Sequence, residues 1–366
     1  MNILVSAAAL RSSGGLSIYK QFLFHLKNNI NGDNYYLFID ACMPAPPMYG
    51  VEYIVIDIRS HIKRIRFDTS ECLSILKEKG INADVAVSLQ NTCVNVGAKR
   101  NILYYHQPLP FYSNHWNPLK KDERLLFYYK WIYPIFVKRS LVENVQVVVQ
   151  IPFIKRGFCK RFHIPEHSVH ILFPDVEKID IEKIELYNWK DNIVHFIYPA
   201  TAFSYKRHKI LISAVSNISN NNPEYLEKFK IHFTISENEV PQLKEYIKNK
   251  GISSNIDFMG RVSHEVLLSM YKSCSALLFP SVVETLGLPL LEAAAFGLPI
   301  VVSDLDYSRE VLGEYAGGRF VASDNLESWS EEILKIIDSP TKYKPIRCNE
   351  ESSWKEFFKL INGTYN

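Results

Sequence analysis

The sequence predicts an α/β protein with two domains, each built on a mostly parallel sheet. Short apolar segments that suit buried strands alternate with longer amphipathic segments that suit helices, from residue 2 to residue 338. The chain has 366 residues, which is long for a single core and suits two domains of about 170 residues each. Hydrophobic residues make up 47% of the chain, enough for two well-packed cores.

The first domain is expected over residues 1–175. Its predicted strands cover 2–6, 35–39, 53–58, 84–89, 101–105, 145–150 and 168–172. Helices are predicted after the Gly14-Gly15 pair and Leu16, ending near residue 27, and over 62–79 and 151–161. A polar, lysine-rich connector through residue 190 follows Pro174 and marks the domain boundary.

The second domain is expected over residues 176–345, and a C-terminal segment over 346–366. Its strands are predicted at 193–198, 230–235, 255–258, 276–280 and before residue 306. Helices are predicted after residue 209 and over 240–248, 264–272, 288–297 and 325–338. A last amphipathic helix is predicted at 353–361.

Composition excludes several classes of function. A net charge of +3 is too small to indicate nucleic-acid binding. The six cysteines are scattered, without CxxC pairs or metal-ligand spacing, so we expect neither a zinc site nor disulfides, and a reducing cytoplasm fits. Residues 1–9 lack the basic start of a signal peptide, and no run of 18 apolar residues could span a membrane.

The most informative stretch is residues 276–297. It predicts a buried strand, a loop with the carboxylate of Glu284, and a helix that opens at Leu288 or Pro289 and places Glu292 just inside. Ligands of open parallel sheets lie beyond the carboxyl ends of the strands, near helix N-termini whose amides favour anions. Two carboxylates there suit sugar hydroxyls, while the amides near Gly287 suit charged oxygens.

The frame Pro-Ser-x-x-Glu-x-x-Gly-Leu-Pro-x-x-Glu-Ala-x-x-x-Gly-x-Pro, which starts at Pro280, resembles the Glu-x7-Glu signature of retaining glycosyltransferases of family 4. The resemblance covers residues 193–338 closely. It implies a GT-B fold, in which two Rossmann-like domains face each other across a deep interdomain cleft. The last helix of that family returns to the N-terminal domain, which we expect of residues 346–366.

The resemblance also implies roles for residues of the second domain. Glu284 would approach the donor sugar and Glu292 would accept hydrogen bonds from ribose hydroxyls, while Gly260-Arg261-Val262 would line the nucleotide base through backbone groups. The rest of the expected donor site is Thr285, Leu286, Gly287 and Leu288.

The loop at residues 199–209 departs from the family pattern. The family has Gly-Arg followed by a lysine here, and the two cations neutralise the donor diphosphate. Lys206 matches the lysine, but Ala200 or Thr201 stands in the place of the arginine. We expect Arg207 or Lys209 to supply the missing positive charge.

In the first domain the resemblance rests on the layout of the elements, Gly14-Gly15 and His106. A glycine pair between a strand and a helix lets backbone amides approach a ligand, and in the family it approaches the donor's phosphate or sugar. His106 follows the strand at 101–105, where the family often has a histidine near the transferring sugar. A structural histidine is the alternative.

Two further segments allow more than one interpretation. Residues 120–139 mix basic and aromatic residues at helical spacing, which suits either a helix packed on the sheet with a charged exterior or contact with an anionic membrane surface. Asp304-Leu305-Asp306 has the pattern of a metal-binding Asp-x-Asp, but we expect turn residues and no metal.

These observations predict a retaining, metal-independent glycosyltransferase without a cofactor. It would move a hexose-type sugar from a nucleotide diphosphate sugar to a saccharide acceptor, expected to be lipid-linked, in bacterial O-antigen or capsule synthesis. We expect a cytoplasmic protein at the inner face of the membrane. The alternatives are a phosphorylase or a nucleotide-sugar epimerase on the same architecture, and a nucleotide-sugar binding subunit with impaired catalysis.

Overall fold

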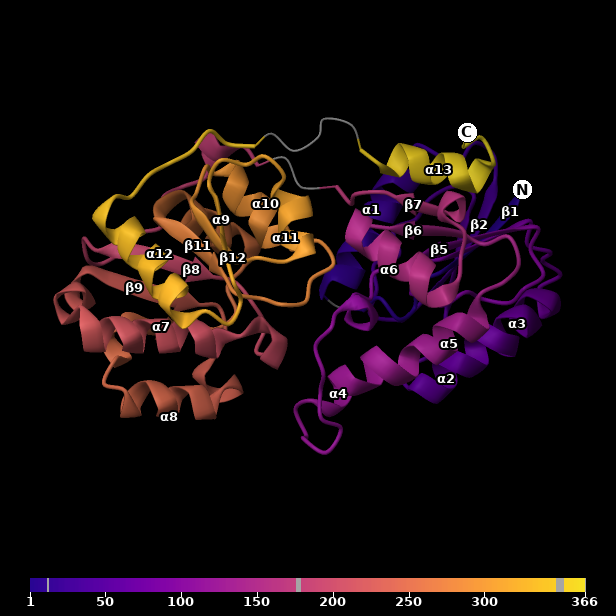
Figure 1. Ribbon diagram of the computed structural model, residues 1–366. Helices are drawn as coiled ribbons and strands as arrows, with labels where there is room; N and C mark the ends of the chain where they lie inside the picture. The colour runs from indigo at the N-terminus through magenta and orange to yellow at the C-terminus, as the bar shows by residue number, and fades with distance from the viewer. Residues whose placement is uncertain (12, 176–178, 347–351, 366) are drawn as a thin grey trace. The chain divides into compact units, whose positions relative to one another are not determined.

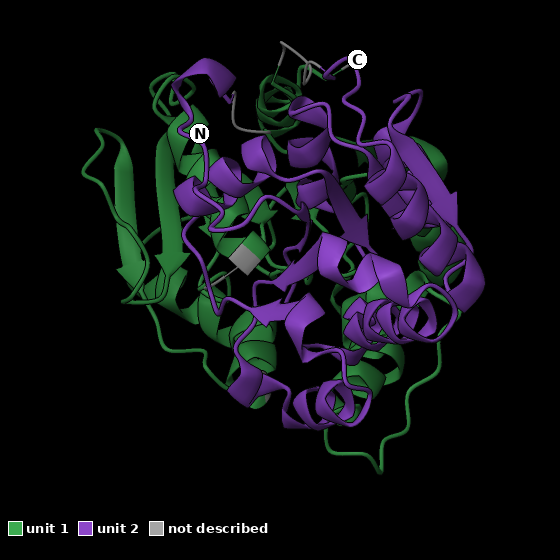
Figure 2. Cartoon of the chain, turned by 90° about the vertical axis from the view of Figure 1, so that its left-hand side faces the viewer, with its two compact units in different colours: residues 1–175, 351–366 green, residues 176–350 purple. Residues whose placement is uncertain are grey.

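The computed structural model describes residues 1–11, 13–175, 179–346 and 352–365. The chain forms two compact units, Met1–Asp175 with Glu351–Asn366 and Val176–Glu350 (Figure 2). Each unit contains a sheet in which the strand pairings of the described residues are parallel. The predicted α/β class is therefore confirmed. Residues 176–178 of the expected connector and 347–351 of the expected C-terminal segment lie outside the described residues.

The first unit has a seven-stranded sheet in the order β3-β2-β1-β4-β5-β6-β7. Because β1 lies between β2 and β4, the strand order changes direction there. In an open parallel sheet this switch point is where the loops leave a crevice for ligands. The strands are β1 Asn2–Ser6, β2 Asn34–Ile39, β3 Val51–Val55, β4 Val85–Ser88, β5 Arg100–Tyr104, β6 Gln146–Val149 and β7 Val169–Ile171.

Helices cover both faces of this sheet. They are α1 Ser13–Leu26, α2 His61–Arg66, α3 Cys72–Glu78, α4 Arg124–Phe127, α5 Tyr133–Ser140, α6 Pro152–Phe162 and α13 Trp354–Asn362. A π-helical turn joins α2 to α3 at Phe67–Glu71, and another joins α4 to α5 at Tyr128–Ile132.

Alternation along β1 explains the two cores of the first unit. Ile3 and Val5 point to one face, where they share a buried cluster with α1 and α13, while Leu4 points to the other, against Phe67 and α3. On the first face the ring of Phe22 from α1 stacks on that of Phe358 from α13, with centroids 5.7 Å apart. The C-terminal helix is therefore part of the core of the first unit.

The second unit has a six-stranded sheet in the order β10-β9-β8-β11-β12-β13. Its switch point lies between β8 and β11, which pair directly. The strands are β8 Val194–Tyr198, β9 Phe229–Phe233, β10 Ile256–Phe258, β11 Ala276–Phe279, β12 Ile300–Ser303 and β13 Gly318–Val321.

The helices of the second unit are α7 His208–Asn221, α8 Pro241–Asn249, α9 His264–Ser273, α10 Leu288–Ala295, α11 Asp306–Leu312 and α12 Leu326–Asp338. α7 packs with α12, and α10 packs with both α9 and α11 (Figure 1). Within the described residues, no helix combines the length and apolar character that a membrane span requires.

The structure corrects several of the predicted elements. The helix predicted over 62–79 is divided into α2 and α3 by the π-helical turn at Phe67–Glu71. α1 begins at Ser13 rather than after Leu16, because a serine and two glycines tolerate the first helical turn, whose amides need no helical partner. β13 was missed, since Gly-Arg-Phe-Val has only one fully buried position. The sequence predicts turn residues at 304–306, whereas α11 begins at Asp306.

Candidate active site

The loops after β8 and β11 leave adjacent strands at the switch point of the second sheet. The loop after β8 ends in a 3-10 turn, Ser204–Lys206, and the loop after β11 runs to Gly287, which precedes α10. Because parallel strands end at the same edge of a sheet, polar residues of these two loops meet there. Their side chains form the candidate site of this unit.

Lys206 and Glu284 form an ion pair between these two loops. Each side chain is only 13% exposed. The Lys206 ammonium also lies 5.5 Å from the centroid of the Tyr205 ring and 5.7 Å from that of Phe279, positions that favour a cation. Two residues that are 78 positions apart in the sequence thus share one charged contact.

The loop after β8 is fixed by its own contacts. The Tyr198 hydroxyl donates to the Lys206 carbonyl at 2.5 Å, and the Val282 amide donates to the Tyr205 carbonyl at 3.0 Å. Burial raises the pKa of Tyr198 far above its usual value, and the negative charge of Glu284 adds to this effect. Tyr198 therefore stays protonated and remains a hydrogen-bond donor.

Glu292 lies on α10 and faces α9. Its carboxylate accepts from His264 Nε2 at 3.1 Å and from the Tyr271 hydroxyl at 3.3 Å. Burial, with the charge of Glu292 added, raises the pKa of Tyr271 far above its usual value. The Glu292 side chain keeps 14% of its surface exposed, so part of it is accessible to a ligand.

The helix start between the two glutamates depends on Gly287. It has a φ of 69°, a left-handed conformation that glycine adopts without strain. Leu286 is buried, while Thr285 and Leu288 are partly exposed. In the first turn of α10, Pro289 has no amide hydrogen and the Leu290 amide donates to the Gly287 carbonyl at 2.8 Å. The positive end of the helix dipole favours anionic groups near the amides of Gly287 and Leu288.

Arg207 and Lys209, which we expected to replace the family's diphosphate-binding arginine, both contact other residues. The Arg207 guanidinium pairs with Asp324 and donates to Ser323 Oγ at 3.4 Å. The Lys209 ammonium lies 5.3 Å from the centroid of the Tyr246 ring on α8. Lys206, in contrast, pairs with Glu284.

The segment expected to line the base follows β10. Gly260 has a φ of 71°, and its amide donates to the Ile235 carbonyl at 3.1 Å. Arg261 is 86% exposed and has Glu239 at 3.6 Å, while Val262 is partly exposed. Ser263 then caps α9 by accepting from the Val266 amide at 3.3 Å.

Asp304, which follows β12, binds an arginine of the next helix, α11. Its two carboxylate oxygens accept from Arg309 Nε at 2.6 Å and Nη2 at 2.8 Å. Asp306 begins α11. Among the described residues, no three His, Cys, Asp or Glu side chains are grouped so that they could hold a metal ion.

The remaining predicted site residues belong to the first unit. Gly14 and Gly15 lie in the first turn of α1, where a Cβ on Gly14 would meet nothing within 4 Å and one on Gly15 would lie 3.0 Å from Leu10 Cδ2. His106 follows β5, and its Nε2 lies 3.2 Å from Asn91 Nδ2. Burial, with the positive charge of Arg64 added, lowers the pKa of His106 to about 4.

Sequence reasoning missed the partners of these residues. Tyr271 and His264 of α9 hold Glu292, and Asn91 holds His106. For Asn91 a signal was present, because it follows the predicted strand at 84–89, where polar residues of a parallel sheet face ligands. Nothing in the sequence linked Tyr271 to Glu292.

Residues 180–352 match the family described as glycosyl transferases group 1. The second unit is a group 1 glycosyltransferase domain. The matched residues include Lys206, Glu284 and Glu292, whereas Gly14, Gly15 and His106 precede them.

A curated relative of the glycosyltransferase is the O-antigen chain mannosyltransferase RfbU of Salmonella typhimurium. The two are 22% identical over 255 residues, which cover 68% of this chain and 67% of RfbU. Among solved structures, the lipopolysaccharide outer core galactosyltransferase WaaB aligns with a TM-score of 0.66 and 16% identity, over 99% of both chains. Anabaena HepE in complex with UDP and glucose aligns with a TM-score of 0.62 and 12% identity, over 93% of this chain and 90% of HepE. The structures show that the glycosyltransferase has the GT-B fold.

Proposed function

We propose that this glycosyltransferase moves a hexose-type sugar from a nucleotide diphosphate sugar to a saccharide acceptor in the assembly of a bacterial surface polysaccharide. The observation that supports this most is the pairing of Lys206 with Glu284 at the switch point of the second sheet, with Glu292 on the helix that follows. RfbU is named for transfer to an O-antigen chain, and HepE was solved with UDP and glucose, which agrees with both substrate classes.

In this proposal each of the three charged side chains binds a different part of the donor. Glu292 accepts from the ribose hydroxyls, because an ionised carboxylate is an acceptor only. Glu284 accepts from hydroxyls of the sugar. Lys206 exchanges its contact with Glu284 for the diphosphate, whose two phosphates offer more negative charge than one carboxylate.

Departure of the diphosphate builds negative charge, which Lys206, the amides of Gly287 and Leu288 and the dipole of α10 would stabilise. We propose that these groups do this without a metal ion and that Gly14, Gly15 and His106 serve the substrates from the first unit. The anomeric configuration would be retained by front-face attack of the acceptor, assisted by the leaving diphosphate. The alternative, a double displacement, would need a carboxylate nucleophile at the anomeric carbon, whereas we assign Glu284 and Glu292 to hydroxyl groups.

The Glu284→Ala variant tests the assignment. We expect transfer to fall by at least about 100-fold, because the sugar loses the acceptor that orients it. Donor turnover with and without acceptor is the measurement, and Glu331→Ala, an exposed position on α12, is the control. Full activity in Glu284→Ala would refute the assignment. Donor consumption by the wild type without any acceptor would point to an epimerase.

We further propose that the acceptor is lipid-linked and that the chain works at an anionic membrane surface. The segment from residue 117 to residue 140 exposes large apolar side chains, with Leu119 at 82%, Leu125 at 45%, Trp131 at 41% and Ile135 at 50%. Exposed basic residues accompany them, namely Lys120, Lys121, Arg124, Lys138 and Arg139. Apolar groups together with lysine and arginine suit the boundary of an anionic bilayer.

Lys130 is not part of that basic surface. Its side chain is buried, its ammonium donates to the carbonyls of Tyr112 and Asn114, and it lies 5.4 Å from the centroid of the Trp116 ring. The segment therefore packs on its own unit through some of its residues and exposes others, and the exposed residues are the ones that we propose to contact the membrane surface.

Vesicle flotation tests the membrane proposal. The double variant Leu125→Ser with Ile135→Ser should bind vesicles of phosphatidylglycerol several-fold more weakly than the wild type, because it loses apolar surface that enters the bilayer. Phe24→Ser, at a position on α1 that is 65% exposed, is the control and should bind normally. Equal flotation of all three proteins, or equal binding to neutral vesicles, would contradict the proposal.

A further inference from the structure

His106 has two well-defined contacts with one neighbour, Asn91. The His106 backbone amide donates to Asn91 Oδ1 at 2.6 Å, and Asn91 Nδ2 lies 3.2 Å from His106 Nε2. A backbone amide is always a donor, so the side-chain atom that it faces has to be the oxygen of Asn91. The amide nitrogen is then the atom that faces the imidazole.

This orientation decides where the proton of the imidazole lies. Asn91 Nδ2 can only donate, so His106 Nε2 has to accept. An imidazole that accepts at Nε2 is neutral and carries its proton on Nδ1. Among the residues that the structure describes, Nδ1 is buried and has no hydrogen-bond partner. A buried donor without an acceptor costs free energy, which a substrate oxygen could recover.

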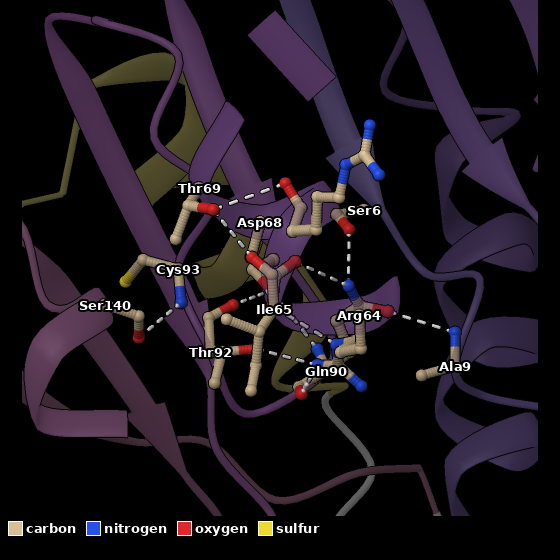
Figure 3. Close-up of polar contacts among 12 residues, drawn as sticks. Ser6, Ala9, Arg64, Ile65, Asp68, Thr69, Gln90, Thr92, Cys93 and Ser140 are labelled. Atoms are coloured by element: carbon tan, nitrogen blue, oxygen red, sulfur yellow. Dashed lines mark hydrogen bonds and ion pairs between the residues drawn. The ribbon is translucent and has the colours of Figure 1, made fainter. Parts of the chain in front are cut away.

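The loop that contains Asn91 is held on both sides. The Gln90 side chain donates to Ser6 Oγ at 2.6 Å and accepts from the Ala9 amide at 3.0 Å, and its backbone carbonyl accepts from Arg64 (Figure 3). Asn91 itself has a φ of 70°, which a non-glycine residue adopts at some cost.

Beyond Asn91, a buried cluster fixes Thr92 and Cys93. The Thr92 hydroxyl donates to Asp68 at 2.6 Å and accepts from Arg64 Nη2 at 2.8 Å, and the Cys93 amide donates to Ser140 Oγ at 3.0 Å (Figure 3). The Arg64 Nε lies 3.2 Å from Asp68 Oδ2. These contacts fix the backbone from which the Asn91 side chain reaches His106.

We propose that Asn91 is a positioning residue that locks His106 as the neutral imidazole with its proton on Nδ1, so that His106 serves the substrate as a hydrogen-bond donor and not as a general base. The inference rests on the proposed function for its link to the substrate, but the locked tautomer can be measured without any substrate. Among the residues that the structure describes, Arg64 adds a positive charge near the imidazole, and the ring of Tyr104 has its centroid 6.2 Å from that of His106.

The experiment uses the full chain labelled with 15N-histidine, in which long-range proton–nitrogen correlations report the protonation of each ring nitrogen. His106→Gln identifies the signals of His106. In the wild type we expect a protonated Nδ1 and an unprotonated Nε2 from pH 7 down to pH 5, in agreement with the lowered pKa. A wild-type proton on Nε2, or titration of His106 near pH 6.5, would overturn the proposal.

Asn91→Asp replaces the amide nitrogen, which donates, with a carboxylate oxygen, which accepts. A carboxylate accepts only, so Nε2 of His106 should become protonated. Transfer should fall by at least about 10-fold and gain a new ionisation in its pH profile, because the donor at Nδ1 is lost or the ring becomes charged. Asn95→Asp adds the same charge at an exposed position of the same loop and should behave as the wild type in both measurements. An unchanged tautomer in Asn91→Asp would refute the role of Asn91.

Asn91→Gly provides a second variant if the aspartate prevents folding, since glycine suits the φ of 70°. It should leave His106 as a mixture of tautomers. A retained single tautomer with the proton on Nδ1 would show that Asn91 does not set it. Failure of the proposed function itself would look different, because the wild type and Asn95→Asp would then transfer no sugar whatever the tautomer of His106.

Discussion

Lys206 and Glu284 neutralise each other in a nearly buried contact, and this sets the order of events that we propose at the site. A charge that leaves water needs a partner, and each of these residues supplies one to the other. When a diphosphate binds, we expect Lys206 to pair with this more highly charged anion and Glu284 to accept from neutral hydroxyls. The ion pair therefore stabilises both charges until the donor replaces it.

His208, the first residue of α7, gives a prediction for the dependence of stability on pH. Burial, with the charge of Lys206 added, lowers the pKa of His208 from 6.5 to about 3. Between these values the unfolded chain takes up a proton that the folded chain refuses, so the stability that is present above pH 6.5 is lost as the pH falls toward 3. His208→Gln should remove a slope of up to about 1.4 kcal/mol per pH unit from the free energy of unfolding.

Urea unfolding at several pH values between 4 and 7 measures this slope. His167→Gln, at an exposed position of the first unit, is the control and should keep the slope of the wild type. The same slope in His208→Gln as in the wild type would contradict the assignment.

Several residues of the candidate site could be proposed from the sequence, and others could not. Glu284 and Glu292 were proposed from their spacing around a helix start, a local pattern. The contact of Lys206 with Glu284 was not predicted, because it joins residues 78 positions apart and depends on β8 and β11 being neighbours. Asn91 was missed, because one polar residue after a strand is common and its importance appears only from its contacts with His106.

Among the elements, the start of α10 depends on a glycine in the left-handed conformation. Gly287→Ala should cost roughly 1–2 kcal/mol of stability, because the left-handed conformation is unfavourable for alanine. The new Cβ would lie 3.3 Å from Leu290 Cδ1 and 3.7 Å from Glu284 Cγ, so we also expect weaker donor binding.

Gly251→Ala is the matched control for this prediction. It has the same φ of 69° but nothing within 4 Å of the new Cβ. Thermal unfolding should show a similar loss in both variants, whereas calorimetric titration with a nucleoside diphosphate should show weaker binding in Gly287→Ala alone. Equal affinities of the two variants for the nucleoside diphosphate would show that the start of α10 does not contribute to donor binding.

At the scale of elements, strong hydrophobic periodicity explains what was predictable. β1, β4, β8 and β11 consist almost entirely of buried residues and were all predicted. β13 has partly exposed positions and a glycine, so its local pattern is weak. The order of the strands was not predicted, since it is set by packing between segments far apart in the chain.

The two units of the molecule share one sheet topology. Both sheets are parallel, and in both the strand order changes direction beside the first strand. The chain also ends in the unit in which it begins, where α13 packs on α1. The two units are therefore expected to differ in how they respond to changes in the last helix.

Phe358→Ala tests this expectation. The ring is 1% exposed and stacks on Phe22, so its removal should destabilise the first unit by about 3–5 kcal/mol. Hydrogen exchange should show faster exchange of β1 and β4 amides, with β8 and β11 unchanged. Phe24→Ala, which removes an exposed ring of α1, is the control. Loss of protection in β8 would contradict the account of the two units.

We propose above all that the donor binds at the switch point of the second sheet. The most direct test is a crystal structure of the chain with a bound nucleoside diphosphate. We expect the ribose hydroxyls on Glu292, the diphosphate on Lys206 and the first turn of α10, and the contact of Lys206 with Glu284 broken or lengthened. A nucleotide bound elsewhere, with that contact and the hydrogen bonds of Glu292 to α9 unchanged, would contradict the claim.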